Sequence, residues 1–308
     1  MKTPCGGFFL KLARHLAVCF SLLSFAAAAE TTAPAPVEGR LVVTGSIALG
    51  NLMTYWAQAF SRHNPLVAVT VATPGGMAGI TALINGATDM ALISTPVNPK
   101  QQEAFKARFG YAPHVIPLAR DAVAVYVNRT NPLNRIALQD LDAIFSSTYR
   151  CSPRQPVRNW GDLGATGDLA QRRINAYGLT VETGTYNLFR EVALCGGDFN
   201  EDFQALAGPG AVENAVSTDV AGIGFSSSTM HSSGMRALAV APRKGGPASA
   251  PTPAAIRSGQ YPMSRTLSIA VNRPSGQPLP PALKAFVDFV LSPEGQDIIA
   301  KAGYVPLP

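Results

Sequence analysis

The feature that most limits the fold of this chain is a repeated pattern in which a short apolar run ends in a loop of small residues. Runs 40–45, 67–72 and 90–93 all end this way, and residues at helical spacing follow the first two loops. Strands that alternate with helices predict an α/β fold with a mainly parallel sheet. Ligands of such sheets bind at the loops that follow the carboxyl ends of the strands, so these loops form the candidate site.

A fourth loop of this kind lies in the middle of the chain, between the apolar run 174–177 and a helical pattern that starts near residue 184. It contains Thr183, Gly184 and Thr185. The first backbone N–H groups of a helix have no partner inside the helix, and together with two hydroxyls they suit a small anion. Threonine is also an ordinary helix N-cap, so a ligand contact and a structural cap both remain open here.

The first 29 residues have the layout of a secretory signal peptide: three basic residues, an apolar core and a run of alanines. We expect cleavage after Ala29, a flexible lead-in over 30–38 and a mature protein in the periplasm. Losing the three basic residues lowers the formal net charge from +6 to +3. No basic stripe with interleaved aromatic residues remains, so nucleic acid is not expected as a partner.

Two of the four cysteines leave with the signal peptide, and Cys151 and Cys195 remain as a pair. In an oxidising compartment a disulfide between them is expected. The histidines show no metal-ligand spacing, so neither a metal site nor a cofactor is expected. The histidines also lie in no recognisable catalytic motif, and segment 224–228 lacks the final glycine of a nucleophile elbow. An enzyme is therefore not expected.

Seven segments occur in an order typical of one family: RDAVAVYVN (120–128), WGDLG (160–164), TGTY (183–186), LCGG (194–197), GIGF (222–225), LSPEGQ (291–296) and GYVP (303–306). Over essentially all of residues 40–308, the chain resembles the phosphate-type solute-binding proteins of ABC transporters. These belong to the type II periplasmic binding protein superfamily.

The resemblance implies two α/β lobes, each with a mainly parallel sheet flanked by helices, that are hinged by two crossover strands and close on a ligand. The first lobe would contain 39–126 plus 266–308, and the second 127–265. A monomer is implied that binds a small solute, with a phosphate-like anion suspected, and delivers it to an ABC permease or another inner-membrane protein.

By the same resemblance, the ligand would contact residues of all four loops. At the position of the family's arginine this chain has Leu179, and the second loop has no hydroxyl. Because each charge-assisted hydrogen bond contributes roughly 1.5–3 kcal/mol, we expect a less polar cleft with Leu179 in its lining. The expected ligand-binding residues are Ser46, Ala48, Gly76, Met77, Ser94, Thr95, Thr183, Gly184 and Thr185.

The departures from the family pattern leave a second function open. A paralogue with a poor ligand site could act as a sensory or scaffolding partner of a membrane protein. Asp121 could accept a hydrogen bond from a protonated ligand, but we expect it to be a buried partner of Arg120 or of a crossover backbone group.

Overall fold

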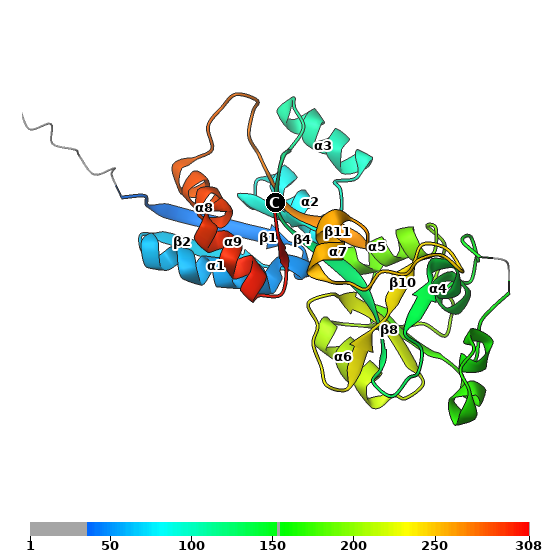
Figure 1. Cartoon of the computed structure of the whole chain (residues 1–308). Helices are drawn as coiled ribbons and strands as arrows, with labels where there is room; N and C mark the ends of the chain where they lie inside the picture. Colours follow the sequence, from blue (N-terminus) through cyan, green and yellow to red (C-terminus); the bar gives the residue numbers. More distant parts are fainter. Residues whose placement is uncertain (1–35, 153–154, 308) are drawn as a thin grey trace, which may run out of the picture. The chain divides into compact units, whose positions relative to one another are not determined.

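The computed structural model describes residues 36–152 and 155–307 (Figure 1). The expected signal peptide and most of the expected lead-in lie outside the described residues. Each helix of the described chain is too short or too polar to cross a bilayer.

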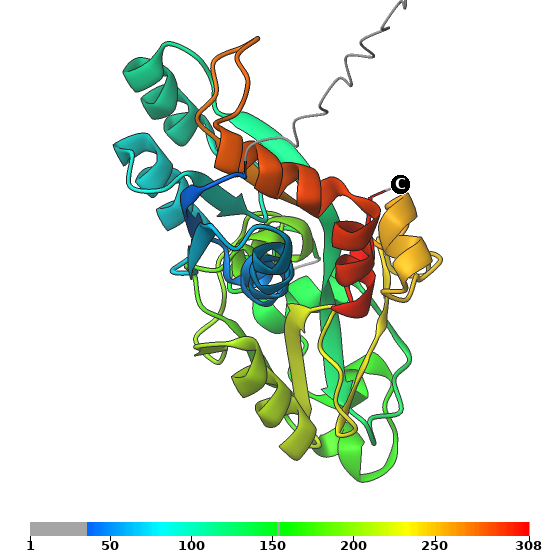
Figure 2. The same cartoon turned by 90° about the vertical axis from the view of Figure 1, so that its left-hand side faces the viewer.

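The first half of the fold is built on three parallel strands, β1, β2 and β3. We call the sheet that they form the N-terminal sheet. Strand β1 lies between β2 and β3, with Val43 opposite Val71 and Thr44 opposite Ala91, so the loops after these strands meet at one edge. Helices α1, α8 and α9 pack together beside this sheet, as Figures 1 and 2 show. Its elements are β1 (Gly39–Gly45), η1 (Ile47–Leu49), α1 (Gly50–His63), β2 (Val67–Ala72), α2 (Gly76–Asn85), β3 (Met90–Ile93), α3 (Pro99–Phe109), β11 (Ser264–Val271), α8 (Pro281–Leu291), α9 (Pro293–Lys301) and β12 (Val305–Pro306).

Strand β4 (His114–Asn128) connects the two halves of the fold. Up to Ala122 it pairs antiparallel with β11, and from Val123 onward it pairs antiparallel with β8 (Gly222–Ser227). In the sequence, the apolar runs 115–118 and 122–127 predict two strands on either side of Arg120 and Asp121, and this prediction is wrong. Both residues stay in the ladder, opposite Thr266 and Arg265 respectively, so the strand continues without a turn.

The second half, which we call the central sheet, has β6 between β8 and β7 with parallel pairing on both sides. Phe189 and Phe225 stack in its core with ring centroids 4.0 Å apart. The fold class is confirmed as α/β. Pairing is parallel among β1, β2 and β3 and among β6, β7 and β8, and antiparallel where β4 and β11 join them. The remaining elements are β5 (Arg135–Ala137), α4 (Leu138–Phe145), η2 (Trp160–Leu163), η3 (Gly167–Gln171), β6 (Asn175–Leu179), α5 (Gly184–Ala193), β7 (Gln204–Leu206), α6 (Pro209–Thr218), β8 (Gly222–Ser227), β9 (Met235–Ala237), β10 (Ala239–Ala241) and α7 (Pro253–Ser258).

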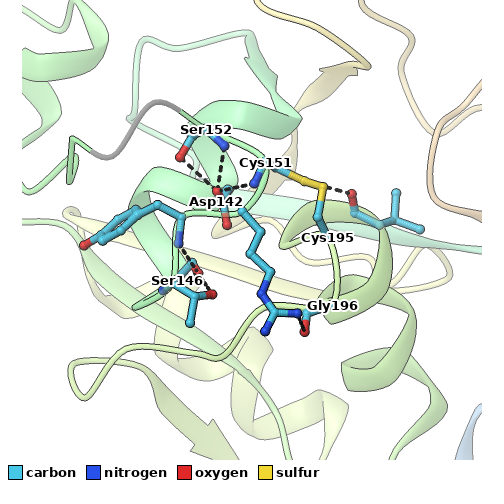
Figure 3. Close-up of a disulfide and its surroundings, with 10 residues drawn as sticks. Asp142, Ser146, Cys151, Ser152, Cys195 and Gly196 are labelled. Carbon is cyan, nitrogen blue, oxygen red and sulfur yellow. Dashed lines mark hydrogen bonds between the residues drawn. A yellow bond between two sulfur atoms is a disulfide. The ribbon is translucent and has the colours of Figure 1, made fainter.

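The expected disulfide between Cys151 and Cys195 is present, with Cα atoms 5.5 Å apart (Figure 3). Asp142 of α4 is fully buried and accepts hydrogen bonds from the backbone amides of Cys151 and Ser152, each at 2.9 Å. Cys195 directly follows the C-cap of α5 with a φ of 50°, a left-handed conformation that often terminates helices. The disulfide therefore joins the carboxyl end of α5 to the segment after α4.

Candidate functional site

The N-terminus of α5 is built by Thr183, which is buried and acts as the N-cap. Its Oγ1 accepts a hydrogen bond from the Tyr186 amide at 3.1 Å and donates one to the Thr180 carbonyl at 2.9 Å. Both hydrogen-bonding roles of this hydroxyl are thus used within the turn. Of the two readings that the sequence left open, these contacts describe a cap.

The loops after β1 and β3 meet the start of α5. Ser46 and Ser94 are both buried, and the Ser46 hydroxyl donates to the Ser94 hydroxyl at 2.8 Å. At Gly184, the first residue of α5, an added Cβ would lie 2.1 Å from Ser94 Oγ. A larger residue would displace the Ser94 hydroxyl, so glycine at this position lets the helix N-terminus lie against the hydroxyls of the N-terminal sheet.

A buried ion pair lies beside this meeting point. Arg265 of β11 donates to Asp121 Oδ2 from Nη2 at 2.7 Å and from Nε at 3.2 Å, and the two side chains are 4% and 0% exposed. Nη2 of Arg265 also donates to Thr185 Oγ1 at 3.1 Å. The third guanidinium nitrogen, Nη1, is buried and has no hydrogen-bond partner among the described residues. An unpartnered buried donor is rare, and a guanidinium fork is well suited to an oxyanion.

The partner of Asp121 is therefore Arg265, whereas the expectation named Arg120 or a crossover backbone group. Arg120 instead donates from Nη1 to the carbonyl oxygen of Ile256 at 3.1 Å. Asp121 Oδ1 also accepts hydrogen bonds from the hydroxyls of Ser227 at 3.1 Å and Ser228 at 3.0 Å. The Asp121 carboxylate therefore accepts hydrogen bonds both from β11 and from the end of β8.

Two tyrosines near this carboxylate stay neutral. Burial raises the pKa of Tyr304 and of Tyr126, and the negative charge of Asp121 raises both further. The Tyr304 hydroxyl donates to the Ala48 carbonyl at 2.8 Å. The only charges in this buried cluster are thus those of the Arg265–Asp121 pair.

The structure brings together part of the set that the sequence predicted. Ser94 contacts both Ser46 and Gly184, and the neighbouring Thr185 accepts a hydrogen bond from Arg265. Leu179 does not line a cleft but packs in the core of the central sheet, 2% exposed, in a cluster with Val212 and Val216. Leu179 ends β6 and packs toward α6, which carries Val212 and Val216.

Arg265 is the residue that the sequence reasoning missed. It belongs to strand β11, far along the chain from the other site residues, so no local motif contains it. The available signal was a charged residue next to an apolar run that reads as a buried strand, since such charges are almost always paired or functional.

Two cavities border the site. The larger has a volume of about 620 Å³ and is lined by Ser94, Thr95 and Arg265, among others. The smaller, about 350 Å³, is lined in part by Gly76, Met77 and Thr95. Met77 is 61% exposed, so it contributes an accessible apolar side chain rather than a buried contact.

Strand β4 and the neighbouring β11 join two sheets, and the buried Arg265 and the N-termini of α2 and α5 lie where the two sheets meet. This arrangement defines the class of protein. The fold is that of a type II periplasmic binding protein. It is similar to a Clostridium perfringens protein solved with bound phosphate, with a TM-score of 0.72 at 24% identity over 88% of this chain and 100% of that one. An ABC-type phosphate transport receptor from Vibrio cholerae has a TM-score of 0.69 at 20% identity, over 87% and 100% of the two chains.

Sequence similarity narrows the class. Residues 30–294 match the model of the PBP superfamily domain. The chain is also 36% identical to the phosphate-binding protein PstS of Pseudomonas aeruginosa over 272 residues, which cover 88% of this chain and 84% of that protein. The chain belongs to the PBP superfamily, in the same family as that PstS protein.

Proposed function

We propose that this protein is the extracytoplasmic solute-binding component of an ABC transporter and that it binds phosphate or a related small oxyanion. The similarity to PstS supports the general role, and it favours ligand binding over a scaffolding role. The observation that supports an anion is the buried Arg265 guanidinium. Its Nη1 has no partner among residues 36–152 and 155–307, while its other two nitrogens donate to Asp121 and Thr185.

Geometry supports an anion more than a neutral solute. The guanidinium supplies a charge-assisted donor, which contributes roughly 1.5–3 kcal/mol. The N-terminus of α5 adds its partial positive charge, worth about 0.3–1 kcal/mol. The hydroxyls of Ser46 and Ser94 add two polar groups beside the start of α5, where they are hydrogen-bonded to each other at 2.8 Å.

We keep the predicted division into lobes as part of this proposal, with 39–126 plus 266–308 in one lobe and 127–265 in the other. The change of pairing partners along β4 between Ala122 and Val123 supports a boundary close to the predicted one. On this view the protein is a non-enzymatic monomer that presents its closed form to an ABC permease in the inner membrane.

The direct test is isothermal titration of the purified protein with inorganic phosphate, together with thermal unfolding. A ligand at about 100 times its Kd raises the free energy of unfolding by roughly 2.7 kcal/mol. In Arg265→Lys the charge remains but the fork is lost, so we expect phosphate binding about 10- to 100-fold weaker. Arg120→Lys is the matched control and should bind as the wild type does. Equal affinities in both variants, or no phosphate binding by the wild type, would contradict the proposal.

A further inference from the structure

Tyr304 connects the loop after β1 to the second half of the fold. It follows α9, its ring packs in the core of the N-terminal sheet, and it is 8% exposed. Its hydroxyl donates to the Ala48 carbonyl at 2.8 Å. A segment near the carboxyl end of the chain is therefore joined to η1, the turn that follows Ser46.

The position of this turn affects the hydroxyls at the site. Ser46 is the N-cap of η1, and its Oγ accepts a hydrogen bond from the Ala48 amide at 3.3 Å. The Ser46 hydroxyl donates in turn to Ser94, which lies against Gly184 at the start of α5. Binding groups work best when supporting residues hold them within about 0.5 Å of their place. A contact that fixes the Ala48 carbonyl therefore also fixes the turn that carries Ser46.

On its other side, Tyr304 meets the loop after β8. An added Cβ at Gly303 would lie 3.6 Å from Thr229 Cβ, so the two segments are in contact. Burial and the charge of Asp121 raise the pKa of Tyr304, and the Thr229 side chain lies near enough to lower it in part. The hydroxyls of Thr229 and Ser227 are 3.0 Å apart. Because the single proton of the Ser227 hydroxyl is donated to Asp121, Ser227 must accept its bond from Thr229.

These contacts form a closed ring around the meeting point of the two halves. From Asp121 the ring continues to Arg265, which donates to Thr185 next to Gly184. Gly184 touches the serines of the N-terminal sheet, and these lead back to the turn that Tyr304 holds. The ring thus crosses between the halves at two places, one at the start of α5 and the other at Tyr304.

We propose that Tyr304 is a positioning residue of the anion site. Its hydroxyl holds the turn that carries Ser46, and Thr229 fixes Tyr304 relative to the Arg265–Asp121 pair. This inference rests on the proposed function, because it concerns a loop proposed to contact the anion. Tyr304 itself touches no ligand and acts through the loop after β1.

The first experiment removes the hydroxyl of Tyr304 and keeps its ring, in Tyr304→Phe. We expect inorganic phosphate to bind about fivefold more weakly in isothermal titration, as for the loss of one neutral hydrogen bond. In the protein without phosphate, hydrogen exchange should become faster at the amides of Ala48 and Leu49, because the turn has lost the contact that holds it.

The matched control is Tyr261→Phe. Tyr261 is fully buried, and its hydroxyl donates to the Val123 carbonyl at 3.0 Å, outside the ring. Each of the two variants loses one tyrosine hydrogen bond to a backbone carbonyl, so urea unfolding should show similar losses of stability. Only Tyr304→Phe should change the phosphate affinity and the exchange at Ala48, whereas a purely structural role would affect the two variants alike.

A second variant tests the link through Thr229. We expect Thr229→Val to weaken phosphate binding about two- to fivefold. Combined with Tyr304→Phe, it should bind no more weakly than Tyr304→Phe alone, because members of one network do not contribute additively. The control is Thr130→Val, where the lost hydroxyl donates to Asn128 Oδ1 at 2.8 Å outside the ring, and its affinity should equal that of the wild type.

Three results would overturn the inference and leave the proposed function intact. Tyr304→Phe could bind phosphate as the wild type does, or Tyr261→Phe could weaken binding equally. The effects of Tyr304→Phe and Thr229→Val could also be fully additive, which would show that the two residues act independently. If the wild type bound no phosphate, the proposed function would fail and this inference with it.

Discussion

Two helices, α2 and α5, start at the site, and their N-termini differ in what they supply. The α5 end has the buried hydroxyls of Thr183 and Thr185, one capping the helix and the other bonded to Arg265. The α2 end has Gly75 as its N-cap, without a side-chain cap in the described structure. Gly75 has a φ of 127°, and an added Cβ would lie 2.8 Å from the Glu182 carbonyl oxygen.

The comparison separates two requirements of a site formed between two halves of a fold. Polar side chains are concentrated at α5 and its neighbour Arg265, whereas the first turn of α2 offers backbone groups, small residues and the apolar Met77. The absence of side chains at Gly75 lets the α2 end approach the turn that precedes α5. One helix therefore offers polar side chains at its N-terminus, and the other allows a close approach between the two halves of the fold.

The largest expected effect comes from removing the cation on the α5 side. Arg265→Met leaves the fully buried Asp121 without its partner, so we expect the free energy of unfolding to fall by about 3–5 kcal/mol. Urea unfolding measures this. Replacing both partners, as Arg265→Met with Asp121→Leu, should recover much of the loss, because no unpaired charge remains buried. A double variant as unstable as the single one would show that the stability of this region does not depend on charge pairing.

The second largest effect is expected from removing the disulfide, which crosslinks only the half of the fold that contains α5. Cys151→Ser with Cys195→Ser should lower the free energy of unfolding by about 2–4 kcal/mol, since it releases a loop with a sequence separation of 44. Hydrogen exchange should increase at the carboxyl end of α5 and stay unchanged in α2. Thiol titration of the denatured wild type should find no free thiol, and two per chain would contradict the bond.

The two threonines of α5 should separate into a structural and a ligand-binding role. Thr183→Val removes the cap and should lower the free energy of unfolding by about 1 kcal/mol. Thr185→Val removes the hydroxyl that helps to hold Arg265, so we expect phosphate affinity to fall about tenfold with a smaller effect on stability. The free energy of unfolding and the phosphate affinity should be measured for both variants. If the two variants changed both quantities by the same amounts, the two roles would not be separate.

The smallest expected effect would make the two helix ends more alike. An added Cβ at Gly76 has its nearest neighbours at 3.9 Å, so Gly76→Ser fits and brings a hydroxyl to the start of α2. We expect phosphate to bind about fivefold more tightly, as for one additional neutral hydrogen bond of roughly 1 kcal/mol. Met77→Ser, at the exposed neighbouring position, should not change the affinity. Weaker binding by Gly76→Ser would show that the site depends on free space at α2.

Much of the fold could be predicted because the strands are short apolar runs and the loops that follow them are rich in small residues. The same local pattern identified Gly184 and Thr185, and the number of cysteines identified the disulfide. Arg265 could not be predicted this way, since it reaches Thr185 only through the pairing of β11 with β4. Leu179 was misassigned for the opposite reason. Its position before α5 was taken from the family pattern, but the strand it ends is buried in the core.

The placement of β11 also bears on how the chain acquires its structure. This strand lies between β3 and β4, although β3 ends at Ile93 and β11 starts only at Ser264. A ribosome must therefore have made nearly the whole chain before the N-terminal sheet can close, and pairing between such distant segments is slow to form. Until that last part of the chain is made, the edge of the N-terminal sheet at β3 lacks the strand that covers it in the described structure.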